Sequence, residues 1–496
     1  MSRSTSKKTV GSLSDTKTES PFVPVALTWL VWSLFVVSTA GLVARVVFDL
    51  RLRLPGVLEV DGLTLLMWTV VTFFSGIVHS YSRRYMAGSR HKTDFFATVF
   101  GFTLVVMGLV AADHIALFGS LWMVMGLLMA RLIGTIRGWQ HAQAAATVAR
   151  NYFVASSGFL SVALAALWWA TGETTVSGIT ASTPAIDGPL LAVAAGALIL
   201  AAMIQSALIP FHTWLLGSMT APTPASALMH AGFVNAGGVL FVRFAPVITV
   251  DPTIMLVITV VGALSALLGK LFKSVQVDTK SRLGCSTVGQ MGFMIMQAGL
   301  GFFGAAITHL ILHGFYKAYM FLSSGEEVEH TKPTDKSHTK KTLGVAGGVV
   351  TVAAGLAGGV VFAALTGKGT SLDSGLLLNG LIVLTMLHAT QGAVSNTDLP
   401  ATYRYGVAPL VSLTAVAVYG LVYTAIKHVM VDVPTVTAPA ELTAVHAVVA
   451  AGFLGTYIAI ETGVYRRSER LYVAFVNATQ APSKTLLTSK EDYNEY

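Results

Sequence analysis

Long apolar runs separated by short polar connections make up almost the whole of this chain. The runs lie near residues 22–48, 62–82, 94–111, 113–136, 149–170, 188–219, 223–246, 252–272, 282–300, 302–323, 341–367, 374–394, 404–428 and 440–463. Each is close to the roughly 20 residues that a helix needs to cross a bilayer. The pattern predicts an all-α polytopic membrane protein with about 14 transmembrane helices.

Polar segments at the two ends divide the chain into three parts. Residues 1–21 are rich in Ser, Thr and Lys, a composition typical of a disordered tail. We expect residues 22–463 to form one transmembrane, antiporter-like domain and residues 464–496 to form a C-terminal tail. We do not expect a signal peptide, because the first apolar run is long enough to span and lacks a small-residue cleavage pattern.

The composition excludes a soluble globular protein. Only 11% of the residues are charged and 54% are hydrophobic, with a mean hydropathy of +0.68, whereas soluble domains are about 25% charged. The net charge of +8 does not indicate nucleic-acid binding, because the basic residues lie between apolar runs. The single cysteine, Cys285, excludes an internal disulfide and a thiolate metal cluster.

The basic residues instead predict an orientation in the membrane. With a cytoplasmic N-terminus, the inner loops and tail hold Arg83, Arg84, Arg90, Lys92, Arg137, Lys273, Lys280, Arg282, Lys332, Lys336, Lys340, Lys341, Arg404, Arg466, Arg467 and Arg470. The opposite side has Arg51 and Arg53, and its loops at 171–187 and 429–440 carry no Lys or Arg. The positive-inside rule therefore predicts a multi-pass protein of the cell inner membrane with both termini cytoplasmic.

Prolines interrupt the sixth apolar run and the start of the seventh. Pro210, Pro222 and Pro224 lie close to Trp214 and His230. A proline removes a backbone donor and frees a carbonyl, and lipid tolerates this only where neighbouring helices or a watery cavity satisfy the freed groups. The prolines predict a discontinuous helix beside a hydrophilic path.

A second interruption is expected at the end of the eleventh run. There the sequence LTGKGTS places Lys368 between Gly367 and Gly369. One broken helix in each half of the chain would fit an inverted repeat with sites near the midplane of the membrane.

The densest group of ionisable residues inside an apolar run is His309, His313 and Lys317. Their i, i+4, i+8 spacing places them close to one face of a helix. Groups that titrate near neutral pH could pass protons along this stripe by way of water. Polar helix–helix contacts are the alternative. A metal site is less favoured, because the stripe carries no acidic residue.

Two further ionisable residues allow two interpretations each. His230, alone in an Ala/Gly-rich run, is either a satisfied core histidine or part of the path beside the broken helix. Arg150 begins the fifth run, where an arginine can simply extend to the membrane surface. The chain contains no Walker motif, nucleophile elbow, HExxH or CxxC. We therefore expect a transporter subunit and not an enzyme, with no catalytic residue, metal site or cofactor of its own.

Seven motifs resemble one known family, and the similarity runs from about Asp61 to Lys317. They are DGLTLLM (61–67), YSRRYM (81–86), ADHIALFGSLW (112–122), IPFHTWL (209–215), PTPASALMHA (222–231), DTKSRLGCSTVGQMGFM (278–294) and HLILHGFYKAYMFLSSG (309–325). They are similar to the antiporter-like membrane subunits of respiratory complex I, especially subunit L, and of multisubunit Na⁺/H⁺ antiporters of the Mrp type.

The resemblance implies roles for particular residues. Family relay positions match His230, His309, His313, Lys317 and, in the expected second broken helix, Lys368. Three positions depart from the family pattern. The family's essential glutamate falls on Met123, its broken-helix lysine on Gln205, and a further relay lysine on Arg150. Arginine keeps the charge but hardly titrates. The resemblance thus implies a working proton route in the C-terminal half and leaves the N-terminal half without its titrating groups.

The ending of the chain resembles a diverged branch found in energy-coupled inorganic-carbon pumps, the DabB type. The resemblance implies a proton-conducting subunit that energises CO₂/bicarbonate uptake through a cytoplasmic, zinc-containing partner of the DabA type, similar to β-carbonic anhydrase. Membrane lipids would be the other partner, and no nucleic acid is expected. Two alternatives are a Na⁺/H⁺ antiporter or complex I-type proton-pumping subunit, and a non-conducting membrane anchor for the partner.

Overall fold

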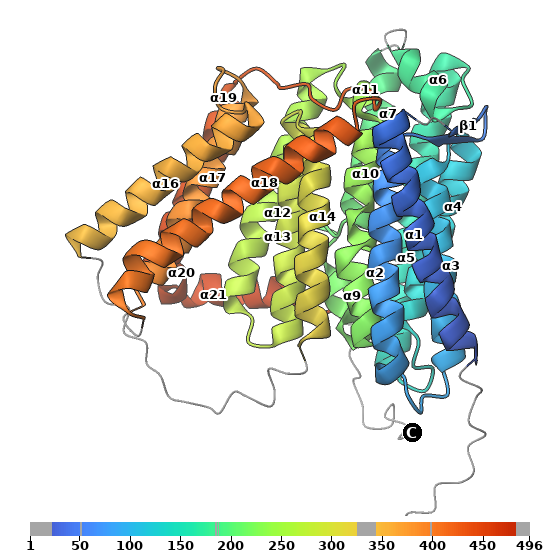
Figure 1. The fold of residues 1–496 in the computed structure, drawn as a ribbon, viewed down its shortest axis with the longest axis horizontal. Helices are drawn as coiled ribbons and strands as arrows, with labels where there is room; N and C mark the ends of the chain where they lie inside the picture. The colour runs from blue at the N-terminus through green and yellow to red at the C-terminus, as the bar shows by residue number, and fades with distance from the viewer. Residues whose placement is uncertain are drawn as a thin grey trace, which may run out of the picture.

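Long helices lie side by side in the computed structural model, which describes residues 22–49, 52–183, 186, 188–324, 344–396 and 399–482 (Figure 1). Within these ranges, twelve helices are long and apolar enough to cross a membrane. Two more of similar length, α13 (Thr279–Gly299) and α14 (Phe303–Leu322), carry more polar residues and lie among the twelve. The chain is thus an all-α, multi-pass membrane protein, and the prediction of about 14 spans agrees with this arrangement.

The N-terminal region contains α1 (Phe22–Phe48), β1 (Leu52–Leu54), β2 (Leu58–Val60), α2 (Gly62–Tyr85), α3 (Lys92–Ala111), α4 (Ile115–Ile133), α5 (Gln140–Thr171) and α6 (Val176–Ala181). The central region contains α7 (Gly188–Gln205), α8 (Thr213–Gly217), η2 (Ser218–Thr220), α9 (Thr223–Ala231), η3 (Phe233–Asn235), α10 (Ala236–Arg243), α11 (Ala245–Ile248), α12 (Pro252–Val275), α13 and α14. The C-terminal region contains α16 (Val345–Thr366), α17 (Ser374–Val394), η4 (Tyr403–Val407), α18 (Ala408–Val429), α19 (Ala444–Thr462), α20 (Val464–Arg467) and α21 (Glu469–Ala478).

Aspartates placed just before apolar runs begin several of these helices. Asp61 caps α2, Asp278 caps α13 and Asp373 caps α17, each by accepting a hydrogen bond from a backbone N–H of the first turn. A carboxylate here satisfies an otherwise unpaired donor and faces the positive end of the helix dipole. The polar connections of the sequence therefore set where the spans start.

The two ends of the helices define two sides of the molecule. The antiparallel pair β1–β2, α6 and the connection from α18 to α19 lie on the upper side of Figure 1, and α21 lies across the lower side. By the charge rule, the lower side is the predicted cytoplasmic side and the upper side is the predicted outer side.

The centre of the molecule is closely packed. Helices α12 and α13 approach each other through glycines, since a Cβ on Gly262 would stand 2.4 Å from the Met296 nitrogen. One on Gly269 would stand 2.3 Å from the Gly289 nitrogen. Small residues permit such an approach between membrane helices. In contrast, α16 and α18 run obliquely to this centre and expose most of their length (Figure 1).

Candidate functional site

The sixth span is interrupted where the sequence predicted. Helix α7 ends at Gln205 and α8 begins at Thr213, with Pro210 in the unwound segment between them. The indole Nε1 of Trp214 donates at 2.9 Å to the Ile204 carbonyl, which also accepts from the Ala207 backbone N–H at 3.2 Å. A neighbouring side chain thus satisfies part of the interrupted backbone, as the membrane environment requires.

The seventh span contains a second interruption that the sequence reading did not anticipate. Pro222 and Pro224 begin α9 as its N-cap and first-turn residues, positions that suit proline. Helix α9 then stops directly after His230, and the single-turn η3 separates it from α10. Gly232 and Asn235 in this stretch are weak helix formers and are the only local signal of the break.

His230 and Lys317 are joined by hydrogen bonds through α13. The His230 Nδ1 donates to the Thr287 hydroxyl at 2.9 Å, and that hydroxyl donates to the Leu283 carbonyl at 3.0 Å. The Lys317 Nζ donates to the same carbonyl at 2.8 Å. Both ionisable side chains are fully buried, and the His230 ring stacks on Phe321 at 4.4 Å. Thr287 and Leu283 are members of this site that the sequence reading missed, because only the packing of α13 brings them there.

The predicted stripe on α14 is present. The rings of His309 and His313 are stacked with their centroids 5.9 Å apart, and Lys317 follows one turn further along the helix. Within the described part of the chain, both nitrogens of His313 and the Nε2 of His309 have no hydrogen-bond partner. Leaving a buried polar nitrogen unpaired costs roughly 1–3 kcal/mol. These nitrogens thus remain free to accept or donate a hydrogen bond.

A cavity of about 410 Å³ reaches the side of this stripe. It lies between α12, α13 and α14 on one side and α17 and α19 on the other, and His309 forms part of its wall. Lys270 and His388 line the same cavity. Water has room here, since each molecule occupies about 30 Å³ in the liquid.

Lys368 does not lie in an interrupted helix, so this part of the sequence prediction is wrong. Helix α16 is continuous and ends at Thr366, because Gly367 follows it in the left-handed conformation (φ 70°). Lys368 follows in the turn to α17, where its Nζ lies 3.6 Å from the centre of the Tyr423 ring, 4.7 Å from that of Phe302 and 5.9 Å from that of Phe362. This buried ammonium is held by aromatic faces and makes no hydrogen bond to any described residue.

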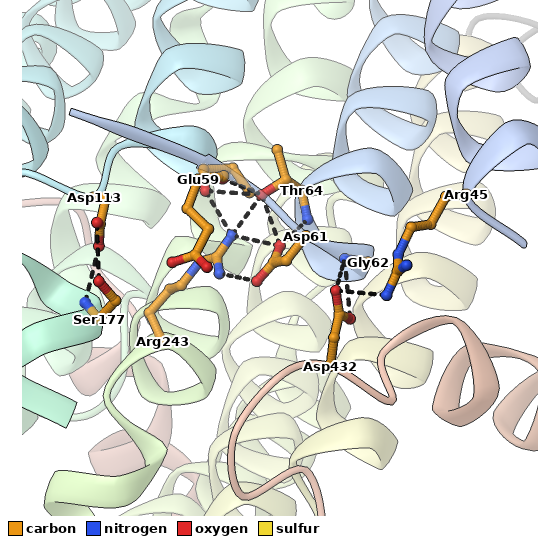
Figure 2. A network of polar contacts seen from close by, with 10 residues as sticks. Arg45, Glu59, Asp61, Gly62, Thr64, Asp113, Ser177, Arg243 and Asp432 are labelled. Carbon is orange, nitrogen blue, oxygen red and sulfur yellow. Dashed lines mark hydrogen bonds and ion pairs between the residues drawn. The ribbon is translucent and has the colours of Figure 1, made fainter. Parts of the chain in front are cut away.

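An ion-pair network lies at the predicted outer side of the N-terminal region (Figure 2). Arg243, the last residue of α10, pairs with Asp61 and also donates to the Thr64 hydroxyl and the Val110 carbonyl, both at 2.7 Å. Burial alone would raise the pKa of Asp61, but the Arg243 guanidinium outweighs it and holds that pKa below its ordinary value. Burial, together with the carboxylate of Asp113, raises the pKa of Glu59 above its ordinary value.

A second pair in the same network connects distant parts of the chain. Asp432, in the connection after α18, accepts from Arg45 at 2.9 Å and from the Gly62 backbone N–H at 3.2 Å (Figure 2). The C-terminal region is thereby attached to α1 and α2.

Comparison with known proteins identifies the family. A model described as NADH:quinone oxidoreductase/Mrp antiporter, TM, matches residues 112–394, more than half of the chain. The chain belongs to this antiporter family. A second model, the N-terminal part of complex I chain 5, matches residues 50–96.

Two curated relatives show how far the similarity extends. A Bacillus subtilis protein named probable inorganic carbon transporter subunit DabB is 33% identical over 416 residues, 80% of this chain and 75% of that one. A Halothiobacillus neapolitanus protein named probable inorganic carbon transporter subunit DabB1 is 39% identical over 289 residues, 56% of this chain. That match spans only 51% of the relative's own length, so the chain spans about half of it.

The fold also matches a solved member of the family. The Mrp complex from Dietzia sp. contains a chain that superposes with a TM-score of 0.55 at 23% identity. The match covers 93% of this chain and 50% of that one. At this identity the likeness supports the fold alone.

The three departures from the family pattern occupy different environments. Gln205 is fully buried at the end of α7, and neither atom of its amide group has a hydrogen-bond partner among the described residues. Met123 is half-buried in an open groove on the surface of α4 and α5, together with Ser157. Arg150 is exposed on α5 and is not joined to the buried histidines and lysines. Its predicted relay role finds no geometric support in this antiporter-family structure.

Proposed function

We propose that this chain conducts protons along His309, His313 and Lys317 and energises inorganic-carbon uptake in a two-component pump. The single observation that carries the proposal is the buried stripe on α14 with its unpaired imidazole nitrogens. The names of the two relatives support the inorganic-carbon role. The other component would be a cytoplasmic, zinc-containing subunit of the DabA type, resembling β-carbonic anhydrase.

The chemistry of the stripe favours protons over sodium. Na⁺ is a hard cation that binds oxygen ligands, whereas His309, His313 and Lys317 present nitrogen. An imidazole takes up a proton on one nitrogen and releases it from the other, and a desolvated lysine releases its proton more readily than one in water. His230 would be coupled to Lys317 electrostatically, because the Leu283 carbonyl accepts hydrogen bonds both from Lys317 and from Thr287, the partner of His230.

Proton movement would supply the energy for uptake. One elementary charge crossing 100 mV releases about 2.3 kcal/mol. Transfer of one or two protons could therefore shift a CO₂ hydration equilibrium by several kcal/mol. The charge on Lys317 would change as protons pass and would bias the conformation of a partner docked on the predicted cytoplasmic side.

Proton flux into vesicles containing the purified complex tests the proposal. A membrane potential should drive acidification with the natural chain, and Lys317→Ala should reduce the rate at least about tenfold, a barrier increase of about 1.4 kcal/mol. Lys427→Ala is the matched control, because Lys427 is an exposed lysine near the end of α18. Unchanged flux in Lys317→Ala, or flux that requires Na⁺, would contradict the proposal.

The partner is tested separately by purifying the native complex from its own membranes. We expect a large cytoplasmic protein with bound zinc to co-purify. Growth at atmospheric CO₂ should then depend on both components and should be lost in the Lys317→Ala strain. Co-purification with quinone-reducing subunits would favour a complex I-type role instead.

A further inference from the structure

A polar cluster outside the α14 stripe joins three helices near their predicted cytoplasmic ends. The Glu461 carboxylate accepts from the His388 Nδ1 at 2.6 Å and from the Gln391 Nε2 at 2.9 Å. The Tyr457 hydroxyl donates to the side-chain amide oxygen, Oε1, of Gln391 at 2.7 Å. The Lys270 Nζ lies 3.4 Å from the His388 Nε2.

The cluster lies toward the predicted cytoplasmic side. Its members come from α12, α17 and α19, and each helix starts on the predicted outer side. Ser374, the first residue of α17, accepts a hydrogen bond from the backbone N–H of Ala440 in the outer connection. Glu461 is the next-to-last residue of α19, and Lys270 lies within the last two turns of α12. The ionisable groups are therefore near one end of the membrane.

The cluster and the α14 stripe share the 410 Å³ cavity. Lys270, His388 and Tyr457 form one part of its wall, and His309 forms another. Lys273 on α12 is the other charged residue that lines it, and α13 contributes the uncharged Ser286 and Gln290. A water-filled passage between His309 and His388 would thus need no movement of the helices.

We propose that Lys270, His388 and Glu461 form a proton-exchange site that connects His309 to the cytoplasmic surface through this cavity. This inference rests on the proposed function. The Glu461 carboxylate orients the His388 ring and stabilises its protonated form, as a carboxylate does for an imidazole base. The Lys270 ammonium repels the protonated His388 ring from the side opposite Glu461. The two effects offset each other, so His388 would bind and release a proton without a large change in free energy.

The ligand of this site is the proton and not a metal cation. Two N–H donors already occupy the oxygens of Glu461, and the Lys270 ammonium lies beyond His388. A bound Na⁺ would have to share these oxygens with two N–H donors and would be repelled by the lysine. A proton needs only the His388 nitrogen that faces Lys270.

Variants of the cluster test the proposal in the vesicle assay. His388→Gln and Glu461→Gln should each slow potential-driven proton flux about fivefold to tenfold, or about 1.0–1.4 kcal/mol of barrier. His428→Gln and Glu441→Gln are matched controls, because both residues are exposed outside the cluster, and they should conduct like the natural chain. If both cluster variants conducted protons as fast as the natural chain, while Lys317→Ala still lost flux, this inference would be overturned and the proposed function would stand. No flux in the natural chain would instead overturn the proposed function.

Access of water to the cavity can be measured without relying on transport. Thr385 lines the cavity one turn before His388, and Leu454 lies on the exposed face of α19. In a Cys285→Ala background, Thr385→Cys should react with a charged, water-soluble thiosulfonate added from the cytoplasmic side. Leu454→Cys, facing lipid, should react at least about tenfold more slowly. Absence of reaction at Thr385→Cys, in protein that still conducts, would contradict a water-filled passage.

Discussion

The interrupted span α7–α8 and the continuous helix α14 are both central, yet their buried polar residues have different chemistry. At the end of α7 the buried side chain is Gln205, an amide that does not titrate. On α14 the buried side chains are His313 and Lys317, which do. A broken helix and a buried titratable residue are therefore separable features. The interruption at Pro210 identifies the scaffold of the family and does not by itself identify a working path.

The spans differ strongly in how much of their surface is buried inside the protein. In the span Thr223–Arg243, which carries His230, 94% of the apolar window is buried, whereas in Tyr403–Val429 only 6% is. Ionisable groups in the packed centre are shielded from lipid, where they would cost several kcal/mol. The α14 stripe lies against this centre, and Arg150 lies on an exposed surface instead.

The largest expected effect concerns the ion pair that fixes the N-terminal region. Asp61→Ala leaves the Arg243 guanidinium without its carboxylate in a largely buried position. Removing one partner of such a pair costs about 3–5 kcal/mol. Thermal unfolding in detergent should show this loss, with Glu441→Ala as an exposed control. Equal melting temperatures would mean that the outer network does not stabilise the region.

The dependence of folding stability on pH tests the same ion pair. Because Asp61 has a lowered pKa in the folded protein, its stabilising contribution is complete above its unfolded pKa of about 3.9. It is lost as the pH falls below that value through the folded pKa. The stability difference between the natural chain and Asp61→Asn should therefore shrink as the pH drops below about 4. A difference that stays constant would assign the effect to packing.

The second-largest expected effect compares α14 with the end of α7. His313→Leu should reduce potential-driven proton flux about tenfold, because it removes a titrating group from the middle of the stripe. Gln205→Leu should keep the flux within about twofold, since it replaces an amide that carries no charge. If Gln205→Leu were the more damaging change, the working path would lie at the N-terminal interruption and not along α14.

The smallest expected effect is at Arg150. Arg150→Gln removes a positive charge from an exposed position on α5, and we expect flux and melting temperature to stay within experimental error. A marked loss of flux would show that α5 takes part in proton transfer after all.

Much of the architecture could be predicted from local sequence. The length of the apolar runs predicted the membrane spans, because a helix must be long enough to cross the bilayer and must form all of its own backbone hydrogen bonds there. Pro210 gave the first interruption, because proline cannot donate a backbone hydrogen bond. The i, i+4, i+8 spacing placed His309, His313 and Lys317 on one face, because helical geometry is local.

Contacts between distant residues could not be predicted in this way. Lys368 was assigned to an interrupted helix from its neighbouring glycines, but α16 ends before it and aromatic rings from other helices surround it. Thr287 carries no sequence signal as a link between His230 and Lys317. Its role follows only from the approach of α13 to α9 and α14.

The sequence by itself determined the membrane spans, the first interruption, the family and which residues are titratable. Each of these depends on residue type and on spacing within one segment. The tertiary structure decided which of those residues come together: Lys317 is linked to His230 through α13, and His309 and His388 line one cavity. These pairings depend on helix packing between segments far apart in the chain, which local spacing does not specify.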